Sequence, residues 1–298
     1  MVSSAFGLSL DFETPPPGAW RERPRGEPGV SLRVAAREQL ERDWSGDEEL
    51  GWEAPIDGAP FLVERGRAGD HRFVHGERSF HLLSADGRLL RSAWHEEEGP
   101  TRWRVLLDSV LFSVSLAFGY EALHAGAIRT EAGVLAIAAA AGGGKSTLLA
   151  ELLKGRATLV SDDVVVLQAR GGTAPLAHPG APLMTVPAAV KPLPGTSIAL
   201  TGGERWVAVA TVPEPLPLAG LVLLDRGPGR PTVMQRVDDP LAILLGSLLR
   251  FPRTTERERA RFEIAAAIAS HVPVWRLSAE PRVTPVKLAD LLRERLAS

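Results

Sequence analysis

The sequence predicts an α/β protein in which a small, mainly β domain over residues 1–100 precedes a larger α/β domain over residues 101–298. Short apolar segments separated by charged turns fill the first part, whereas strand-like and helix-like apolar segments alternate in the second part. A chain of 298 residues is also long for a single domain. We therefore expect two domains, the second with a sheet covered by helices.

The first domain is predicted from four short apolar segments. They are Phe6–Leu10, Val30–Val34, Pro60–Val63 and Phe80–Leu83. The proline-rich stretch Pro15–Gly29 is expected to be a loop. Five of the seven tryptophans lie in the first 103 residues, where core filling is favoured over a peptide-binding face. His71 and His75 lie on a segment that resembles a strand ending at a glycine, so no metal is assigned to them.

A long apolar stretch, Val105–Leu123, opens the second domain. Asp108, Glu121 and Gly119 interrupt it, which makes it too short to span a membrane. Its apolar residues recur at helical spacing, so it predicts a buried helix.

A glycine-rich run between a strand and a helix is the strongest motif. The apolar segment Gly133–Ala138 precedes it, and the helix-like Leu148–Leu153 follows. Glycines let successive N–H groups turn toward one anion, and a helix N-terminus adds positive potential. The run predicts a nucleotide phosphate-binding loop near the pattern G-x-x-x-x-G-K-[ST], with Ala139 at the first glycine position. The residues predicted to bind phosphate are Ala141, Gly142, Gly143, Gly144, Lys145, Ser146 and Thr147.

Within this loop, Lys145 is expected to reach the β- and γ-phosphates, and the Ser146 hydroxyl to bind Mg²⁺. The alternative is a glycine-rich turn with a chance Lys-Ser pair.

Two adjacent carboxylates, Asp162 and Asp163, end the next apolar strand, Ala157–Ser161. Only one short helix and one strand fit between Ser146 and Asp162, so we expect the strand to neighbour the loop in a parallel sheet. Such short spacing favours a small kinase over switch and transport ATPases. We assign Asp162 to the metal and Asp163 as the base that takes the proton from an attacking hydroxyl. The alternative is a solvated turn after a strand.

A histidine near the start of the strand before the loop completes the pattern. Leu123–Ile128 is predicted to be one strand, and His124 lies at its beginning. With the loop and the acid pair, this arrangement resembles the catalytic domain of the bacterial HPr kinase/phosphorylase family, a phosphoenolpyruvate-carboxykinase-like P-loop fold. The resemblance is strongest over residues 105–185 and extends to HPr-kinase-related serine kinases encoded beside ribosomal peptide genes. Without it, a lone histidine on an apolar strand is more often a core residue.

The resemblance implies a P-loop kinase domain that binds ATP and Mg²⁺ and transfers a phosphoryl group to a hydroxyl. It implies catalytic roles for His124, Lys145, Asp162 and Asp163. The chain departs from the family because Val164–Gly203 contains no Asp or Glu, so the family's second acidic metal ligand is missing or comes from elsewhere. The family's arginine-bearing loop is also not found. Phosphorylase activity and HPr itself as a substrate are therefore not expected.

The rest of the chain continues the α/β pattern. The predicted strands and helices are Val164–Leu167, Val207–Ala210, Leu221–Asp225, Leu241–Leu249, Val272–Leu277 and Val286–Leu296. The proline-rich stretch Ala174–Pro194 is expected to be irregular and to lie over the active site, with Lys191 either solvated or near substrate. Arg250–Arg261 predicts an exposed, self-paired helix face, with a phosphate-sensing arginine as the alternative.

The composition of the chain limits the classes of binding partner that we expect. The 34 basic and 36 acidic residues give a net charge of −2, so neither nucleic acid nor an anionic membrane is expected as a partner. The chain has no cysteine, and Met1–Leu10 lacks a signal-peptide pattern, which favours a cytoplasmic location. The sequence leaves open whether the chain forms a homo-oligomer.

Taken together, the motifs predict an ATP- and Mg²⁺-dependent kinase acting on a serine of a peptide or small protein, such as a ribosomal peptide precursor. Two alternatives stay open. One is a small-molecule kinase for free serine or another alcohol, and the other is a nucleotide-binding scaffold with reduced catalysis.

Overall fold

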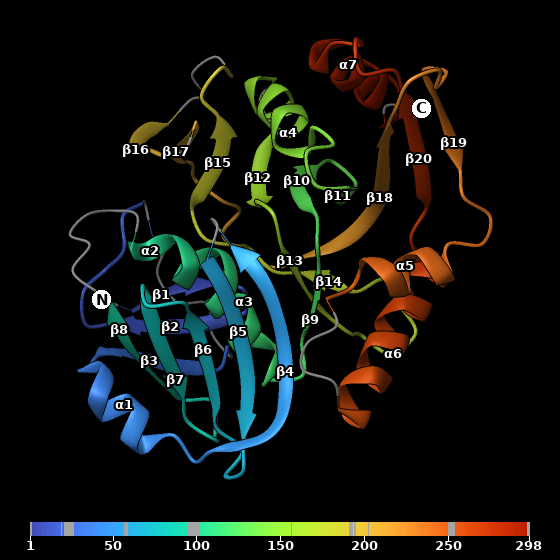
Figure 1. The fold of residues 1–298 in the computed structure, drawn as a ribbon. Helices are drawn as coiled ribbons and strands as arrows, with labels where there is room; N and C mark the ends of the chain where they lie inside the picture. The colour runs from blue at the N-terminus through green and yellow to red at the C-terminus, as the bar shows by residue number, and fades with distance from the viewer. Residues whose placement is uncertain are drawn as a thin grey trace.

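The computed structural model shows a mixed α/β protein with several sheets (Figure 1). It describes residues 2–18, 20, 27–56, 59–94, 102–155, 157–190, 193, 195–201, 203–249 and 254–296, and the side chains of residues 47–56, 201 and 296 are not described. Lys191 and Arg250 lie outside the described residues.

An eight-stranded sheet forms the N-terminal part, in the order β1-β2-β3-β8-β7-β6-β5-β4. Its elements are β1 (Val2–Ala5), β2 (Leu8–Phe12), β3 (Gly29–Val34), α1 (Arg37–Asp43), β4 (Asp47–Ile56), β5 (Ala59–Gly66), β6 (His71–His75), β7 (Ser79–Leu83) and β8 (Leu89–Trp94). All four predicted strands are present, and the segment with the two histidines is a strand, as expected. The alternating burial along β3 shows why these residues form strands, since one face packs on the core.

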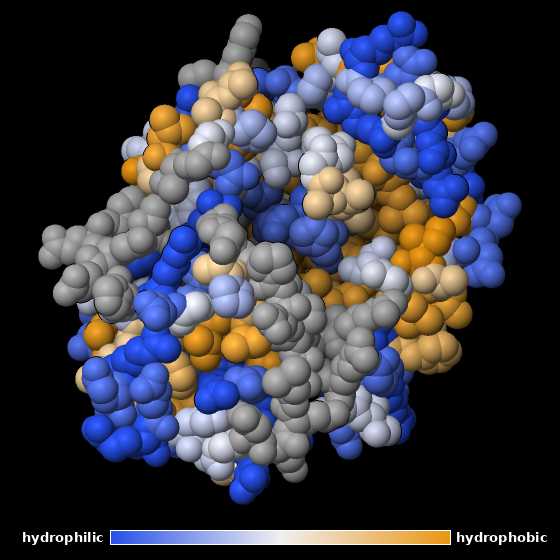
Figure 2. All heavy atoms as spheres, viewed as in Figure 1, coloured by the Kyte–Doolittle hydropathy of each residue, from blue (hydrophilic) through white to orange (hydrophobic). Residues whose placement is uncertain are grey.

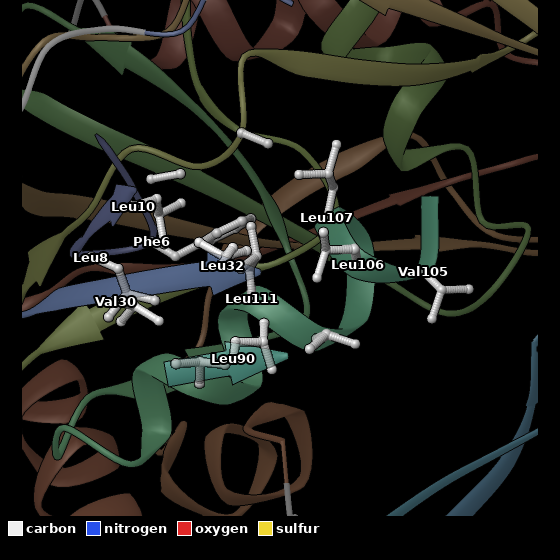
Figure 3. Packing of buried hydrophobic residues seen from close by; sticks show 14 of the residues in the cluster. Phe6, Leu8, Leu10, Val30, Leu32, Leu90, Val105, Leu106, Leu107 and Leu111 are labelled. Carbon is white, nitrogen blue, oxygen red and sulfur yellow. The ribbon is translucent and has the colours of Figure 1, made fainter. Parts of the chain in front are cut away.

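The predicted buried helix, which begins the second half of the chain, covers this sheet. It consists of α2 (Arg102–Val105), the π-helical turn η1 (Leu106–Val110) and α3 (Leu111–Leu116). Its apolar side chains point into one cluster with those of β2, β3 and β8 (Figure 3). Trp103 is buried there and Trp20 and Trp94 pack against the cluster, as core filling predicts. No helix in the described ranges is both long and apolar enough to cross a membrane.

The same core cluster also contains residues far along the chain, including Val166, Leu183 and Trp206. The first sheet is therefore in direct contact with the second half of the chain. The division into domains at residue 100 stays a prediction.

A second sheet has the order β12-β10-β11-β18-β14-β13-β9, and β20 pairs with both β18 and β19. Its strands are β9 (Glu121–Leu123), β10 (Gly126–Thr130), β11 (Gly133–Ala139), β12 (Thr158–Ser161), β13 (Val165–Gln168), β14 (Leu176–Ala177), β18 (Leu216–Arg226), β19 (Val233–Arg236) and β20 (Val274–Ala279). Alternate residues of β11 and β18 enter two different cores, as the period of a strand requires. The helices are α4 (Lys145–Lys154) and α7 (Pro285–Leu296) over one core, and α5 (Leu241–Ser247) and α6 (Thr255–His271) over the other.

Two predictions about the centre of this sheet are wrong. The predicted strand Leu123–Ile128 is broken at His124, because β9 pairs with β13 whereas β10 pairs with β11 and β12. The strand before the acid pair, β12, is also not the neighbour of β11. Strands β10 and β11 form a hairpin, so β10 lies antiparallel between the two.

This hairpin nevertheless brings the motifs together. Strands β11 and β12 are both antiparallel to β10, so they run in the same direction. Both end at the edge of the sheet where β10 begins: Ala127 pairs with Ser161, and Gly126 pairs with Ile137. The loop, the acid pair and His124 therefore meet at one edge.

The stretch Ala174–Pro194 is less irregular than predicted. It contains β14 and β15 (Leu183–Pro187), and β15 forms a three-stranded sheet with β17 (Glu204–Ala208) and β16 (Thr196–Thr201). Backbone pairing with a distant part of the chain gives this proline-rich segment its regular structure.

The exposed arginine face predicted for Arg250–Arg261 is also wrong in part. Helix α6 packs on α5 and β9, and it turns Arg257 and Arg261 inward, where they are 7% and 4% exposed. Arg259 remains on the exposed side and pairs with Glu263. Arg261 pairs with Glu258 on the same helix, so the self-pairing is present as expected, but the arginine face is not fully exposed.

Candidate functional site

The glycine-rich loop connects the end of β11 to the start of α4. Gly142 and Gly144 have φ angles of 72° and 91°, in the left-handed region that favours glycine. A side chain on Gly143 would place its Cβ 2.9 Å from the Ala140 carbonyl oxygen. The first helical hydrogen bond runs from the Leu148 N–H to the Gly144 carbonyl, so the preceding N–H groups have no partner within the helix. Such an end can bind an anion.

Every site residue predicted from the sequence lies on one cavity of about 370 Å³. The predicted residues on its wall are His124, Ala141, Gly142, Gly143, Gly144, Lys145, Ser146, Thr147, Asp162 and Asp163. Their roles stay predictions, but their meeting at one place is a property of the fold.

Lys145 and Asp163 form an ion pair across this cavity. The Lys145 ammonium donates to Asp163 Oδ1 and to its carbonyl oxygen, the latter at 3.3 Å. Asp163 has a φ of 63°, which is uncommon for a residue other than glycine. Burial would raise the pKa of Asp163, but the nearby charges of Lys145 and His124 hold it below its ordinary value. Asp163 is therefore ionised at neutral pH.

Asp162 has a different environment although it is the adjacent residue. Its Oδ2 accepts a hydrogen bond from the Thr185 N–H at 2.8 Å, whereas its buried Oδ1 has no hydrogen-bond partner among the described residues. Burial and then the charge of Asp163 raise the pKa of Asp162 to about 6. A buried carboxylate oxygen without a partner is costly unless a cation or water meets it.

The donor set fits Mg²⁺. Mg²⁺ prefers oxygen ligands and is often bound by one or two carboxylates together with substrate phosphates. Asp162 and Ser146 both line the cavity, and the carboxylate and hydroxyl oxygens that they carry are ligands of this kind. Within the described ranges, no group of three or more His, Cys, Asp or Glu side chains could hold a metal by itself. A metal here would therefore need the phosphates as further ligands.

His124 lies in the turn between β9 and β10 rather than on a strand. Its Nδ1 is 3.9 Å from Asp163 Oδ1, and its side chain is 41% exposed, so it is not a core histidine. Burial, followed by the charge of Lys145, lowers the pKa of His124, and Asp163 only partly opposes this.

Three charged residues on the same cavity were missed in the sequence: Arg104, Asp108 and Glu204. Arg104 Nη2 donates to Glu204 Oε2 at 2.7 Å, and its Nε is 3.8 Å from Asp108 Oδ2. Glu204 is the first acid after the acid-free stretch Val164–Gly203, which is the only signal that could have pointed to it. Asp108 interrupts an apolar stretch of the sequence, a pattern that does not indicate a site.

Comparison with known proteins gives distant similarity to solved structures. No protein-family model and no curated protein matches the sequence. Among solved structures, the Hpr(Ser) kinase/phosphatase from Coxiella burnetii is similar to 59% of this chain and 96% of its own, with a TM-score of 0.35 and 15% identity. The similarity is distant in both sequence and structure.

Proposed function

We propose that the protein is an ATP- and Mg²⁺-dependent kinase that transfers the γ-phosphoryl group to a hydroxyl, in the first place a serine of a peptide or small protein. The observation that carries the proposal is a single cavity lined by the glycine-rich loop, the Lys145–Asp163 pair and Asp162. One buried carboxylate oxygen of Asp162 has no hydrogen-bond partner among the described residues. Phosphate binding, metal binding and proton acceptance each have a group there.

Phosphate binding uses the loop and Lys145. The N–H groups at the start of α4 face an anion with no competing helical bond, and glycines at 142–144 let the phosphates approach the backbone. Lys145 exchanges part of its contact with Asp163 for the β- and γ-phosphates. Mg²⁺, held by the Ser146 hydroxyl and Asp162, supplies positive charge against the phosphate oxygens when bound.

Transfer then needs a base beside the terminal phosphate. The acceptor oxygen forms a bond to the γ-phosphorus while the bond from that phosphorus to the bridging oxygen breaks, and ADP leaves with the electron pair. The acceptor proton goes to the ionised Asp163 carboxylate. His124 at 3.9 Å stabilises and orients that carboxylate. Arg104 lines the same cavity, but its charge is balanced by Glu204 and Asp108.

The test is phosphoryl transfer from radiolabelled ATP to candidate acceptors, including peptides encoded beside the gene, free serine and other small alcohols. Asp163→Asn should reduce the transfer rate about a hundredfold and preserve Mg²⁺-ATP binding, because only the base is lost. Asp290→Asn on exposed α7 is the matched control and should transfer normally.

The outcomes separate the alternatives. Transfer only to free alcohols selects the small-molecule kinase. Tight ATP binding without transfer to any acceptor selects the scaffold. An Asp163→Asn protein that transfers at the normal rate refutes the base assignment.

A further inference from the structure

A second and larger cavity, of about 870 Å³, adjoins the site. It lies over the face of the second sheet opposite to α4, where Ala138, Leu223 and Arg276 pair in one row across β11, β18 and β20. Strand β5 of the first sheet, helix α3 and helix α5 complete its walls. Figure 2 shows a hollow on this face, with hydrophilic residues in its middle and hydrophobic residues on the side where β18, β20 and α5 lie.

The cavity is not an extension of the phosphate-binding loop. Residues 141–147 line only the smaller cavity, and the larger one reaches the loop only at its beginning, Ala138–Ala140. The two cavities share His124 and Ala140. A molecule in the larger cavity therefore approaches the site from the side of His124, next to the Asp163 carboxylate, where an attacking hydroxyl must arrive.

The walls of the cavity have two kinds of chemistry. Most of it is apolar, with Phe61, Phe112, Ile243 and Leu248 among the lining residues. The hydroxyls of Ser113 and Ser247 are occupied, because each donates to a backbone carbonyl four residues earlier. The wall thus offers apolar contact rather than hydrogen bonds along much of its length.

The charged part of the cavity has an uncompensated cation. Arg230 and Asp225 pair at 3.0 Å, which cancels their charges. Arg276 is exposed to the cavity and makes no hydrogen bond or ion pair with the described residues. An unpaired guanidinium beside an apolar wall is suited to a carboxylate or another planar anion.

The geometry points to the 870 Å³ cavity as the acceptor site, which binds an alcohol with an apolar body and one anionic group: the anion at Arg276, and the hydroxyl beside His124. This inference rests on the proposed kinase function. The volume is in the range of small-molecule sites, and it also accommodates the carboxyl-terminal residues of a peptide.

The first test compares two fluorescent probes that share one aromatic body and differ by an anionic sulfonate group. They are 8-anilinonaphthalene-1-sulfonate and its neutral analogue N-phenyl-1-naphthylamine. The anionic probe should bind at one site about tenfold more tightly than the neutral one, because a charged hydrogen-bond partner is available. Arg276→Gln should remove this difference.

Arg236→Gln is the matched control. Arg236 lies on the neighbouring strand and pairs with Trp275, so it points to the opposite face of the sheet. It should leave the preference for the anionic probe unchanged. A preference that survives Arg276→Gln, or that Arg236→Gln abolishes equally, would overturn the inference.

A second variant tests the cavity itself. A Cβ on Gly246, in α5 on the cavity wall, would meet no heavy atom within 4 Å, so the side chain of Gly246→Leu starts in open space. It should abolish binding of both probes without lowering the melting temperature. Probe binding that persists in this variant places the probes elsewhere and contradicts the inference.

Competition identifies the ligand class. The non-hydrolysable analogue AMP-PNP with Mg²⁺ should bind together with the anionic probe; competitive displacement would make the cavity part of the nucleotide site and overturn the inference. N-acetyl-seryl-leucine should displace the probe, and its carboxamide should not. A hexapeptide ending in the same two residues distinguishes two sources of the ligand. Tighter binding of the hexapeptide indicates a peptide terminus, and binding of the dipeptide alone indicates a free small molecule.

These probe measurements need no catalysis. If the probes bind as expected but the protein does not bind Mg²⁺-ATP, the kinase function is refuted and the cavity's preference for an anionic ligand stands. If the protein binds Mg²⁺-ATP but the probes do not bind as expected, only the acceptor site is refuted.

Discussion

Two ion pairs in this protein have similar chemistry and opposite surroundings. Lys145 and Asp163 meet on the wall of a cavity, and the Asp163 side chain is 50% exposed. Arg257 and Glu121 meet between α6 and β9, where Glu121 is fully buried and Arg257 is 7% exposed. The first pair can change partners when a ligand enters, and the second has no space to do so.

The buried pair of Arg257 and Glu121, here called the sealed pair, has the features of a structural element. Arg257 also donates to the Tyr120 carbonyl, which fixes the start of β9 just before His124. Burial raises the pKa of Glu121 in spite of the opposing charge of Arg257. Glu121 Oε2 and two Arg257 nitrogens have no partner among the described residues. A charge alone therefore does not mark a site; access to a cavity distinguishes the two pairs.

The largest effect is expected from breaking the sealed pair. Arg257→Ala leaves a buried carboxylate without its partner, and should lower the free energy of unfolding by about 3–5 kcal/mol. Arg259→Ala on the same helix, whose side chain is 81% exposed, should cost less than about 1 kcal/mol. Urea unfolding measures both. If both variants lost the same free energy of unfolding, the buried pair would contribute no more to stability than the exposed one.

A change beside the exposed pair of Lys145 and Asp163 should alter activity rather than stability. His124→Ala removes the group that lies 3.9 Å from Asp163, and should lower the transfer rate about tenfold to a hundredfold while the melting temperature changes little. His271→Ala, at the exposed end of α6, is the control and should behave as the native protein. Unchanged kinetics in His124→Ala would assign this histidine a passive role.

A third effect concerns the dependence of stability on pH. The pKa of Glu121 is raised from 4.5 to about 7 in the folded protein, so the folded state binds more protons than the unfolded state between these values. The contribution of Glu121 to stability is present below pH 4.5 and is lost as pH rises toward 7. Glu121→Gln should flatten this part of the curve of urea midpoint against pH. If the contribution of Glu121 to stability instead increased as pH rises from 4.5 to 7, the raised pKa of Glu121 would be contradicted.

The parts of the fold that the sequence predicted are those encoded by consecutive residues. The strand, the glycines and the helix of the loop follow one another, and so do β12 and the acid pair. Their spacing alone limits where they can lie. For Lys145 and Asp163, this spacing predicted one shared place, whereas the site role of His124 was implied by the resemblance to the HPr kinase family.

The parts that escaped prediction depend on pairing between distant segments. Nothing in the local pattern shows that the chain breaks at His124, because β9 finds its partner β13 much later in the chain. Arg257 is in a charged segment and becomes buried only because α6 packs on α5 and β9. Arg104 and Glu204 are 100 residues apart in the chain and meet only in the folded protein, so neither had a motif to identify it.

The central claim is that the loop, Lys145 and the acid pair bind one triphosphate. Calorimetric titration with AMP-PNP tests it most directly, with Lys154→Ala as the control at the far end of the same helix. We expect one site that requires Mg²⁺, affinity reduced about a hundredfold in Lys145→Ala, and native affinity in the control. Binding that ignores Mg²⁺ and Lys145, or no binding at all, would contradict the account.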